Sequence, residues 1–270
     1  MVASAGAEQA DVVLELARRY DRERLLACLF TPAEKRRRLA ALILLNAELA
    51  RIPELVREPM AGLVRYQWWR EQITRTAGGG PAEHPALAVL AEELAGGGIA
   101  TERLLTILEA HATLFESGGL ADEAACELHA ARTSGLLQAL SARVLAGGSG
   151  EAVGLAEEVG TAYGMTGLLR AAPRLARCGI ILLPEPGGDL RAARIKGIAA
   201  RVRDRLAGLG TREWRLLDSP TRLLARLAAR HHRKLVRTSG AAQDPPPDGD
   251  PWLPLRLLLW GSLRRGPPRL

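Results

Sequence analysis

Apolar residues recur at intervals of three and four along most of this chain, and clusters of glycine or proline separate one such stretch from the next. This spacing places apolar side chains on one face of an α-helix. A clear example begins at Pro32, with Thr31 where a capping residue is expected. One stripe of this helix contains Leu39, Leu42, Ile43, Asn46, Leu49 and Ile52. Long runs of β-branched residues are absent, so the sequence predicts an all-α fold without strands.

The same periodicity continues to the end of the chain. Helices are predicted from Pro59 onward and then over residues 84–95, 100–115, 122–145, 151–177, 191–209, 221–237 and 254–265, with a short turn at 213–218. Aromatic residues make up only 4% of the chain, so Leu, Ala, Val and Ile must fill the core. We expect one helical domain over residues 1–240, an extended proline-rich tether over 241–251, and a C-terminal helix within 252–270 that packs on the same domain.

The net charge of +7 is concentrated in the C-terminal third. Between Arg191 and Arg237 basic residues recur almost every turn, and only Asp204, Glu213 and Asp218 oppose them. Such a field suits anionic lipid or an acidic protein, although a solvated helix face explains it equally well. Nucleic acid is not expected, because no zinc finger, RNA-recognition signature or cluster of stacking aromatics accompanies the charge. His231 and His232 lie in this basic stretch, and we expect them at the surface.

Cysteine usage and hydropathy indicate the compartment. The three cysteines are far apart and form no metal-ligand spacing, which is typical of a reducing compartment and argues against a zinc site. The first residues, MVASAGAEQADVV, lack the pattern of a signal or transit peptide, and no apolar run is long enough to span a bilayer. We therefore expect a cytoplasmic protein.

Two segments carry a more specific signal. The first is LLNAELARIPELVREPMAGLVRYQWWRE (44–71), and the second is TGLLRAAPRLARCGIILLPE (166–185). In order and spacing, they resemble the two signature regions of the squalene and phytoene synthase family, and the resemblance covers nearly the whole chain. The matching positions are Gly62, Arg65, Gln67, Trp68, Trp69, Arg70, Thr166, Leu169, Arg170, Gly179, Leu183 and Pro184.

The resemblance implies a bundle of antiparallel helices of the isoprenoid-synthase type around a deep apolar cavity. In active members, two aspartate-rich helices face each other across its mouth and hold magnesium that binds an allylic diphosphate. Ionising a carbon–diphosphate bond leaves a multiply charged anion that metals must neutralise, so the chemistry requires those carboxylates.

This chain departs from the family pattern at those positions. Ala50 and Glu54 occupy the positions of one aspartate pair, and Ala171 and Leu175 occupy those of the other. Arg174 replaces a further acid, and residues 159–184 contain no acid in any register. We therefore expect no catalytic residue, no metal site and no cofactor, with magnesium required only if the protein is an active enzyme after all.

Arginines lie beside the positions of the missing acids. Arg170, Arg174 and Arg177 follow the spacing i, i+4, i+7 on one helix face, near Pro173 inside the helix, and predict a site for an anion or another ligand. The matching residues Arg65, Gln67 and Trp69 are further ligand-binding candidates. The alternatives are a solvated arginine stripe and, for the tryptophan pair, core packing.

Within the family, the chain resembles a non-catalytic branch of assembly factors for respiratory complex I. This resemblance implies a protein client, such as a complex I subunit, and an assembly or chaperone-like role. A second hypothesis is an active prenyltransferase that condenses two allylic diphosphates head to head. A third, compatible with the first, is a peripheral protein on the inner face of an anionic membrane that binds lipid or a prenyl chain.

Overall fold

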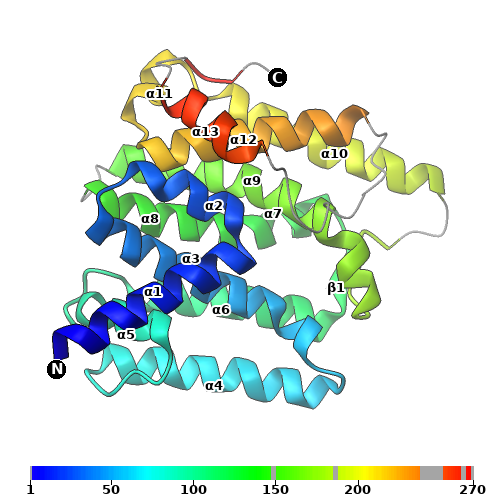
Figure 1. Ribbon diagram of the computed structural model, residues 1–270. Coiled ribbons are helices and arrows are strands. Elements are labelled where there is room, and N and C mark those ends of the chain that lie inside the picture. Colours follow the sequence, from blue (N-terminus) through cyan, green and yellow to red (C-terminus); the bar gives the residue numbers. More distant parts are fainter. Residues whose placement is uncertain (1, 147–149, 185–187, 238–251, 263–265, 269–270) are drawn as a thin grey trace.

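A computed structural model describes residues 2–146, 150–184, 188–237, 252–262 and 266–268 of the chain. The described residues form helices almost throughout (Figure 1), which confirms the predicted all-α fold. The helices are α1 (Val2–Tyr20), α2 (Arg22–Ala27), η1 (Cys28–Phe30), α3 (Ala33–Leu55), α4 (Pro59–Ala77), α5 (Pro85–Ala95), α6 (Thr101–Ser117), α7 (Glu123–Ala130), η2 (Ala131–Gly135), α8 (Leu136–Ala146), α9 (Gly150–Arg177), α10 (Gly188–Ala207), α11 (Thr211–Leu216), α12 (Ser219–Arg237) and α13 (Leu253–Ser262).

The expectation that the chain contains no strand is wrong at one small place. Strands β1 (Gly119–Leu120) and β2 (Ile181–Leu182) pair in parallel, with Gly119 opposite Ile181. They follow α6 and α9, whose ends are turned by glycines with positive φ at Gly118 and Gly179. A Cβ at Gly119 would lie 2.0 Å from the carbonyl oxygen of Ile181, so only glycine allows this approach. A two-residue strand is too short to leave an alternating pattern in the sequence.

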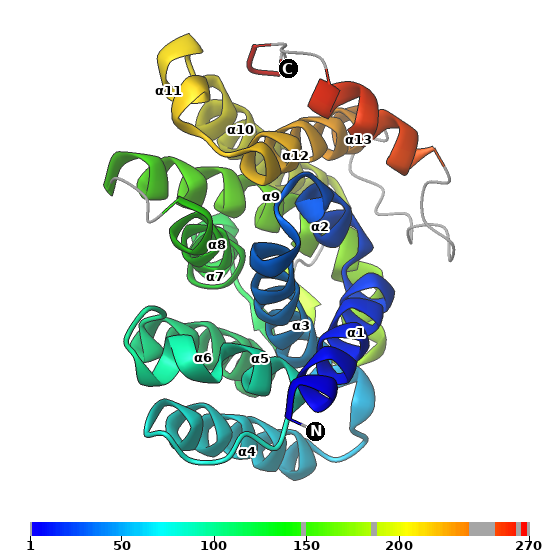
Figure 2. The same ribbon diagram turned by 60° about the vertical axis from the view of Figure 1, so that its left-hand side comes forward.

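Helix α3 lies at the centre of one half of the molecule (Figure 2). Every side chain from Leu39 to Leu45 is buried, because α1, α4, α5, α6 and α8 all contact α3. The predicted one-sided stripe is therefore only part of its buried surface. Pro32 occupies the N-cap position, and the predicted cap Thr31 instead donates a hydrogen bond from Oγ1 to the carbonyl oxygen of Cys28 at 2.7 Å.

The long helix predicted over 122–145 contains a π-helical turn, η2, between α7 and α8. The extra residue in a π-turn widens the helix and shifts the side chains that follow it, and such turns are frequent at functional sites. Helix α9 packs closely against η2. A Cβ at Gly160 would lie 2.5 Å from the carbonyl oxygen of Ser134, so the small residues of α9 allow this contact.

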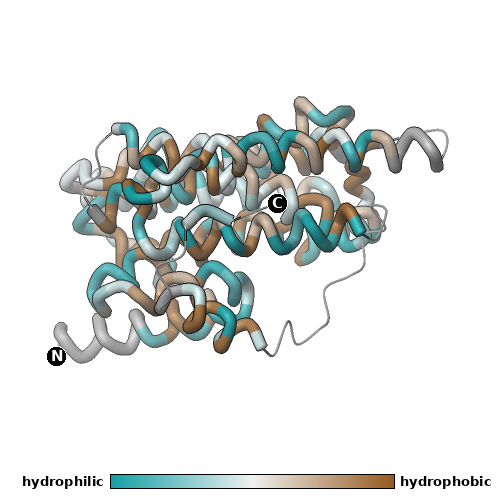
Figure 3. The backbone as a smooth tube through the Cα atoms, turned by 90° about the horizontal axis from the view of Figure 1, so that it is seen from above, coloured by the Kyte–Doolittle hydropathy of each residue, from teal (hydrophilic) through white to brown (hydrophobic). Residues whose placement is uncertain are grey.

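Two large clusters of buried apolar side chains form most of the core. One lies among α1, α3–α6 and α8, and the other joins α2, α7 and α9–α13. Hydrophilic and hydrophobic residues alternate along the individual helices (Figure 3), as amphipathic packing requires. Leu253 and Leu257 of α13 are buried in the second cluster, whereas the proposed tether, 241–251, lies outside the described residues. Among the described residues, no helix is both long and apolar enough to cross a bilayer.

Candidate functional site

A cavity of about 270 Å³ lies between the N-terminal helices, α3, α6, the π-turn and α9. Its apolar wall includes Leu114 and Leu168, and its polar groups include two histidines, Asn46 and four arginines. The arginines are Arg24, Arg51, Arg170 and Arg174. The cavity is therefore less apolar than the family resemblance implies.

The structure brings together, at this cavity, positions that the family resemblance aligns with motif aspartates. Ala50 of α3 and Ala171 and Leu175 of α9 line it directly. Beside them, Nε of Arg174 lies 2.7 Å from Oε1 of Glu54, so the arginine of one motif forms an ion pair with the acid of the other. The two segments, more than a hundred residues apart in the sequence, thus face each other as the motif positions require.

Arg170 projects from α9 into a buried polar cluster. Its Nη1 lies 3.1 Å from Oε2 of Glu23 and 2.9 Å from Nε2 of His231. The hydroxyl of Tyr163 donates to the same carboxylate oxygen at 2.8 Å, and Nε2 of His231 lies 2.8 Å from it. Because Nε2 carries either a proton or a lone pair, it can donate to Glu23 or accept from Arg170, but not both at once.

This cluster shifts the pKa values of its members. Burial alone would raise the pKa of Glu23, but the hydrogen bond and charge of His231, the charge of Arg170 and the Tyr163 hydroxyl lower it well below its usual value. Burial lowers the pKa of His231, an effect that the hydrogen bond to Glu23 opposes. The carboxylate of Glu23 is thus held ionised beside Arg170.

The expectation that His231 and His232 lie at the surface is wrong, since both are buried. His231 points toward Glu23, an acid supplied by α2. The residues next to His231 in the sequence could not reveal this partner, because Glu23 lies about two hundred residues earlier in the chain. The arginine face of α9 likewise has no acid beside it on the same helix. Its counter-charges come from other helices, because Glu23 of α2 pairs with Arg170 and Glu54 of α3 pairs with Arg174.

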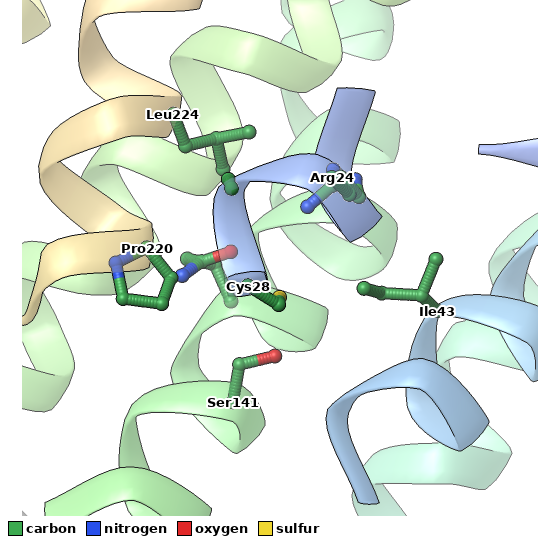
Figure 4. A pocket seen from close by; sticks show the side chains of 8 residues that line it. Arg24, Cys28, Ile43, Ser141, Pro220 and Leu224 are labelled. Atoms are coloured by element: carbon green, nitrogen blue, oxygen red, sulfur yellow. The ribbon is translucent and has the colours of Figure 1, made fainter. Parts of the chain in front are cut away.

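Arg24 of α2 lines the cavity and is only 5% exposed. Its Nε lies 3.1 Å from Oδ2 of Asp21, and its Nη2 donates to the hydroxyl of Ser134. Nη1 is buried and has no hydrogen-bond partner among the described residues. Figure 4 shows Arg24 at a second, much smaller cavity of about 10 Å³, together with Cys28, Ile43 and Ser141. That space suits about one water molecule, the kind of partner that a buried guanidinium N–H needs.

Two histidines line the main cavity near Asn46. His111 of α6 and His129 of α7 lie with ring centroids 5.4 Å apart, and Nε2 of His111 is 3.2 Å from Oδ1 of Asn46. Burial lowers the pKa of both histidines, that of His129 to about 4, so both are neutral at neutral pH. They add hydrogen-bonding groups to the wall without adding charge.

The remaining sequence candidates lie away from this cavity. Arg65 and Gln67 are exposed on α4, where Gln67 donates to Glu71 at 2.8 Å. Trp69 is buried against His84, with ring centroids 4.6 Å apart, which matches the packing alternative. Arg177 is exposed near the end of α9 and does not line the cavity. Helix α4 contributes no residue to the cavity wall.

Sequence reasoning missed the contribution of the α1–α2 junction. Tyr20, Asp21 and Arg24 line the cavity, and Glu23 lies behind them. In the stretch YDRERLL, an aspartate precedes a helix, which is a helix-cap signal that the sequence does contain. In the structure, Asp21 accepts a hydrogen bond from the backbone N–H of Arg24. Nothing local predicts the π-turn that brings Thr133 and Ser134 to the wall.

The lining does not suit magnesium. Mg²⁺ prefers carboxylate oxygens with near-octahedral geometry, and the only carboxylate among the lining residues is that of Asp21. Burial raises the pKa of Asp21 against the lowering effect of Arg24, its ion-pair partner. Within the described part of the chain, no three His, Cys, Asp or Glu side chains are grouped as metal ligands.

The chain is similar in sequence to known proteins. A sequence model of the squalene/phytoene synthase family matches residues 17–243. "NADH dehydrogenase (ubiquinone) complex I, assembly factor 6" of Rattus norvegicus is 30% identical over 160 residues, which cover 59% of this chain and 48% of the rat protein. The protein of the same name from Homo sapiens is 28% identical over 160 residues, with the same coverage. The chain thus spans about half the length of these curated relatives.

Solved structures agree on the fold. The crystal structure of squalene synthase HpnC from Alicyclobacillus acidocaldarius superposes with a TM-score of 0.71 at 16% identity, over 87% of this chain and 96% of the other. A dehydrosqualene synthase in complex with a ligand gives a TM-score of 0.78 at 13% identity, over 96% and 97%. Since the family model matches most of the chain, this protein belongs to the squalene/phytoene synthase family.

Proposed function

We propose that this protein is a non-catalytic member of its family that assists the assembly of respiratory complex I and binds an anionic ligand in its cavity. The ion pair between Arg174 and Glu54 carries the first part of the proposal. It joins the two motif segments at the positions where the family resemblance implies metal-binding carboxylates. A guanidinium thereby occupies a place that a metal-dependent reaction needs for an acid.

The chemistry of prenyl transfer supports the same reading. Cleavage of a carbon–diphosphate bond needs the leaving anion to be neutralised as it forms. Ala50, Ala171 and Leu175 present alkyl groups at the cavity wall and cannot bind a cation. Each loss of about 1.4 kcal/mol of transition-state stabilisation costs a factor of about ten in rate. Losing one carboxylate from the α3 pair and both from the α9 pair should therefore remove useful catalysis.

A product assay tests this first part. The purified protein, incubated with farnesyl or geranylgeranyl diphosphate and magnesium, should form no squalene, phytoene or hydroxysqualene above the level of a heat-killed sample. A preparation free of host synthase is the necessary control. Product above that level would establish the active prenyltransferase instead.

The assembly role is supported by the relatives named as assembly factors of complex I. Deleting the gene should lower NADH oxidation by membranes, and the wild-type gene should restore it. Succinate oxidation, which does not draw on NADH, serves as the control. Loss of a carotenoid or hopanoid product with unchanged NADH oxidation would contradict the proposal.

Anion binding is supported by the charges around the cavity. Three arginines have a carboxylate partner, namely Asp21 for Arg24, Glu23 for Arg170 and Glu54 for Arg174. The guanidinium of Arg51 instead lies 3.7 Å from the ring centroid of Tyr20. Glu48 lies near Arg51, but burial raises its pKa against the effect of that arginine. The excess of guanidinium groups favours phosphate or carboxylate, which arginine binds directly.

The size of the cavity limits the ligand. Its volume of about 270 Å³ is slightly below that of typical ligand pockets, which span about 300–1,000 Å³. We therefore propose a small anion or the charged headgroup of a larger lipid.

Inorganic pyrophosphate in EDTA is a suitable probe of this site. It should raise the melting temperature of the wild type, because ligands that bind only the folded state stabilise it. Arg51→Gln with Arg174→Gln should abolish the increase. Arg170 is a poorer choice for substitution, since its loss would leave the buried Glu23 short of a partner.

The control is Arg57→Gln with Arg177→Gln, which removes the same charge from exposed residues that do not line the cavity. It should respond to pyrophosphate as the wild type does. Equal responses of the two double variants would contradict binding in the cavity.

We further propose peripheral association with the inner face of an anionic membrane. The net charge of +7 and the basic stretch from Arg191 to Arg237 support this placement.

A further inference from the structure

Helix α13 carries apolar side chains on two opposite faces. The inner face packs on α2 and α12, with Leu253 and Leu257 each only 2% exposed. The outer face presents Trp252, which directly precedes the helix, and Leu255, Leu258 and Leu259. These four side chains are 63%, 50%, 54% and 52% exposed, in that order. A helix that is apolar on both sides is normally covered on both sides.

Helix geometry makes the outer residues one surface. At 3.6 residues per turn, Trp252, Leu255, Leu258 and Leu259 fall within an arc of about 120°. Exposed Arg256 stands at one edge of this arc. Single exposed apolar residues are ordinary, but four large ones on a short helix form a patch of the kind that marks an interaction site.

The charged side chains of α12 and α13 are all basic. Helix α12, which α13 contacts, contains no acidic residue, and α13 contains none either. The basic residues of the two helices are Arg222, Arg226, Arg230, Arg233, Lys234, Arg237 and Arg256. Arg233, Lys234 and Arg237, at the end of α12, are exposed.

We propose that the outer face of α13, formed by Trp252, Leu255, Leu258 and Leu259, is the surface that docks on an anionic lipid bilayer. This assignment rests on the peripheral association proposed above and names the element that performs it. The leucines would enter the boundary between headgroups and acyl chains. The basic residues of α12 and Arg256 would lie near the anionic headgroups.

The composition of the face favours a bilayer over a protein partner. Protein interfaces of stable complexes carry about one hydrogen bond per 100–200 Å². The outer face of α13 offers three alkyl side chains and one indole. A tryptophan at the edge of a leucine surface flanked by basic residues is the pattern of interfacial helices that lie in the plane of a membrane.

The experiment compares two double variants in vesicle co-sedimentation. Leu255→Ser with Leu258→Ser alters exposed residues of α13, and Leu253 and Leu257 remain to anchor the helix. Met60→Ser with Val64→Ser is the matched control, because these residues are 68% and 63% exposed on α4. Helix α4 lies at the opposite end of the molecule from α13 (Figures 1 and 2).

The wild type should bind vesicles of phosphatidylcholine with about 30% phosphatidylglycerol more tightly than vesicles of phosphatidylcholine alone, and salt should weaken the binding. The α13 variant should bind about tenfold or more weakly, since each leucine contributes severalfold on entering an apolar phase. The α4 variant should bind as the wild type does. Circular dichroism establishes that both variants are folded.

Each of the other possible outcomes would overturn either the assignment to α13 or peripheral association itself. Wild-type binding with an unaffected α13 variant would remove the assignment to α13 and leave peripheral association standing. Equal losses in both variants would also remove it. No binding by the wild type would overturn peripheral association as well. A dimer in sedimentation velocity that dissociates in the α13 variant, without vesicle binding, would show that a second copy covers this face.

Discussion

At the scale of single residues, Glu23 has the densest set of polar contacts beside the cavity. One of its oxygens is within hydrogen-bond distance of Tyr163, Arg170 and His231, which come from α9 and α12. A buried carboxylate is tolerated only when hydrogen bonds and opposite charge compensate for lost hydration. Glu23 therefore fixes the position of Arg170, one of the four arginines that line the cavity.

Glu23→Gln should lower the free energy of unfolding at neutral pH by on the order of 2 kcal/mol, because Arg170 would lose its charged partner. For a chain of this length, that corresponds to a fall in melting temperature of roughly 4–8 °C. Thermal unfolding measures it. Glu116→Gln, an exposed substitution on α6, is the control and should change little.

The lowered pKa of Glu23 predicts that the loss of stability in Glu23→Gln depends on pH. The pKa of Glu23 is lower in the folded protein than the ordinary value of 4.5, so the ionised group stabilises the fold above that pH. The contribution is lost as the pH falls below about 4.5, through the pKa of the folded state. The difference in stability between Glu23→Gln and the wild type should therefore shrink below that pH. A constant difference down to strongly acidic pH would contradict the assigned role.

At the scale of elements, the close packing of α9 on the π-turn η2 positions the cavity. Gly160 and Gly164 of α9 face Ser134, and a Cβ at either would lie within 2.6 Å of a Ser134 atom. This approach brings Ser134 within hydrogen-bonding reach of Arg24. The packing of α9 against η2 thus connects the walls of the cavity that α2, η2 and α9 form.

Two glycines of α9 provide a matched test of that packing. Gly160→Ala should destabilise the protein by about 1–3 kcal/mol, because its Cβ would meet a backbone oxygen and the Cβ of Gln138. Gly154→Ala has open space around it and should stabilise the helix by up to about 1 kcal/mol. Chemical denaturation gives both values. Equal stabilisation by the two substitutions would mean that α9 does not approach η2 so closely.

At the scale of the whole molecule, the cavity lies between two apolar cores, and charged groups from both halves meet at it. The ion pairs Arg170–Glu23 and Arg174–Glu54 join α9 to α2 and to α3. Opposite charges therefore pair between segments that the family resemblance expects to meet around a metal. Such pairs contribute modestly to stability when partly exposed, as the Arg174 pair is.

Magnesium should consequently leave the melting temperature of the whole protein unchanged, and EDTA should do the same. Only a ligand that binds the folded state raises its stability, and the cavity offers no group of carboxylates to bind the ion. Differential scanning fluorimetry with and without millimolar magnesium measures this. A clear increase with magnesium alone would reveal a metal site formed by other residues.

The sequence by itself determined the helical class, most of the helix positions and the alkyl side chains at Ala50, Ala171 and Leu175, which the family resemblance aligns with motif acids. These properties are local, because helical periodicity and residue identity can be read along the chain. Only the tertiary structure decided the partners of the arginines, the burial of His231 and the separation of Trp69 from the cavity. Glu23 lies 147 residues from Arg170, and no periodicity along one helix encodes which other helix supplies its counter-charge. The outer face of α13 is also a tertiary property, since it depends on which sides of the helix its neighbours cover.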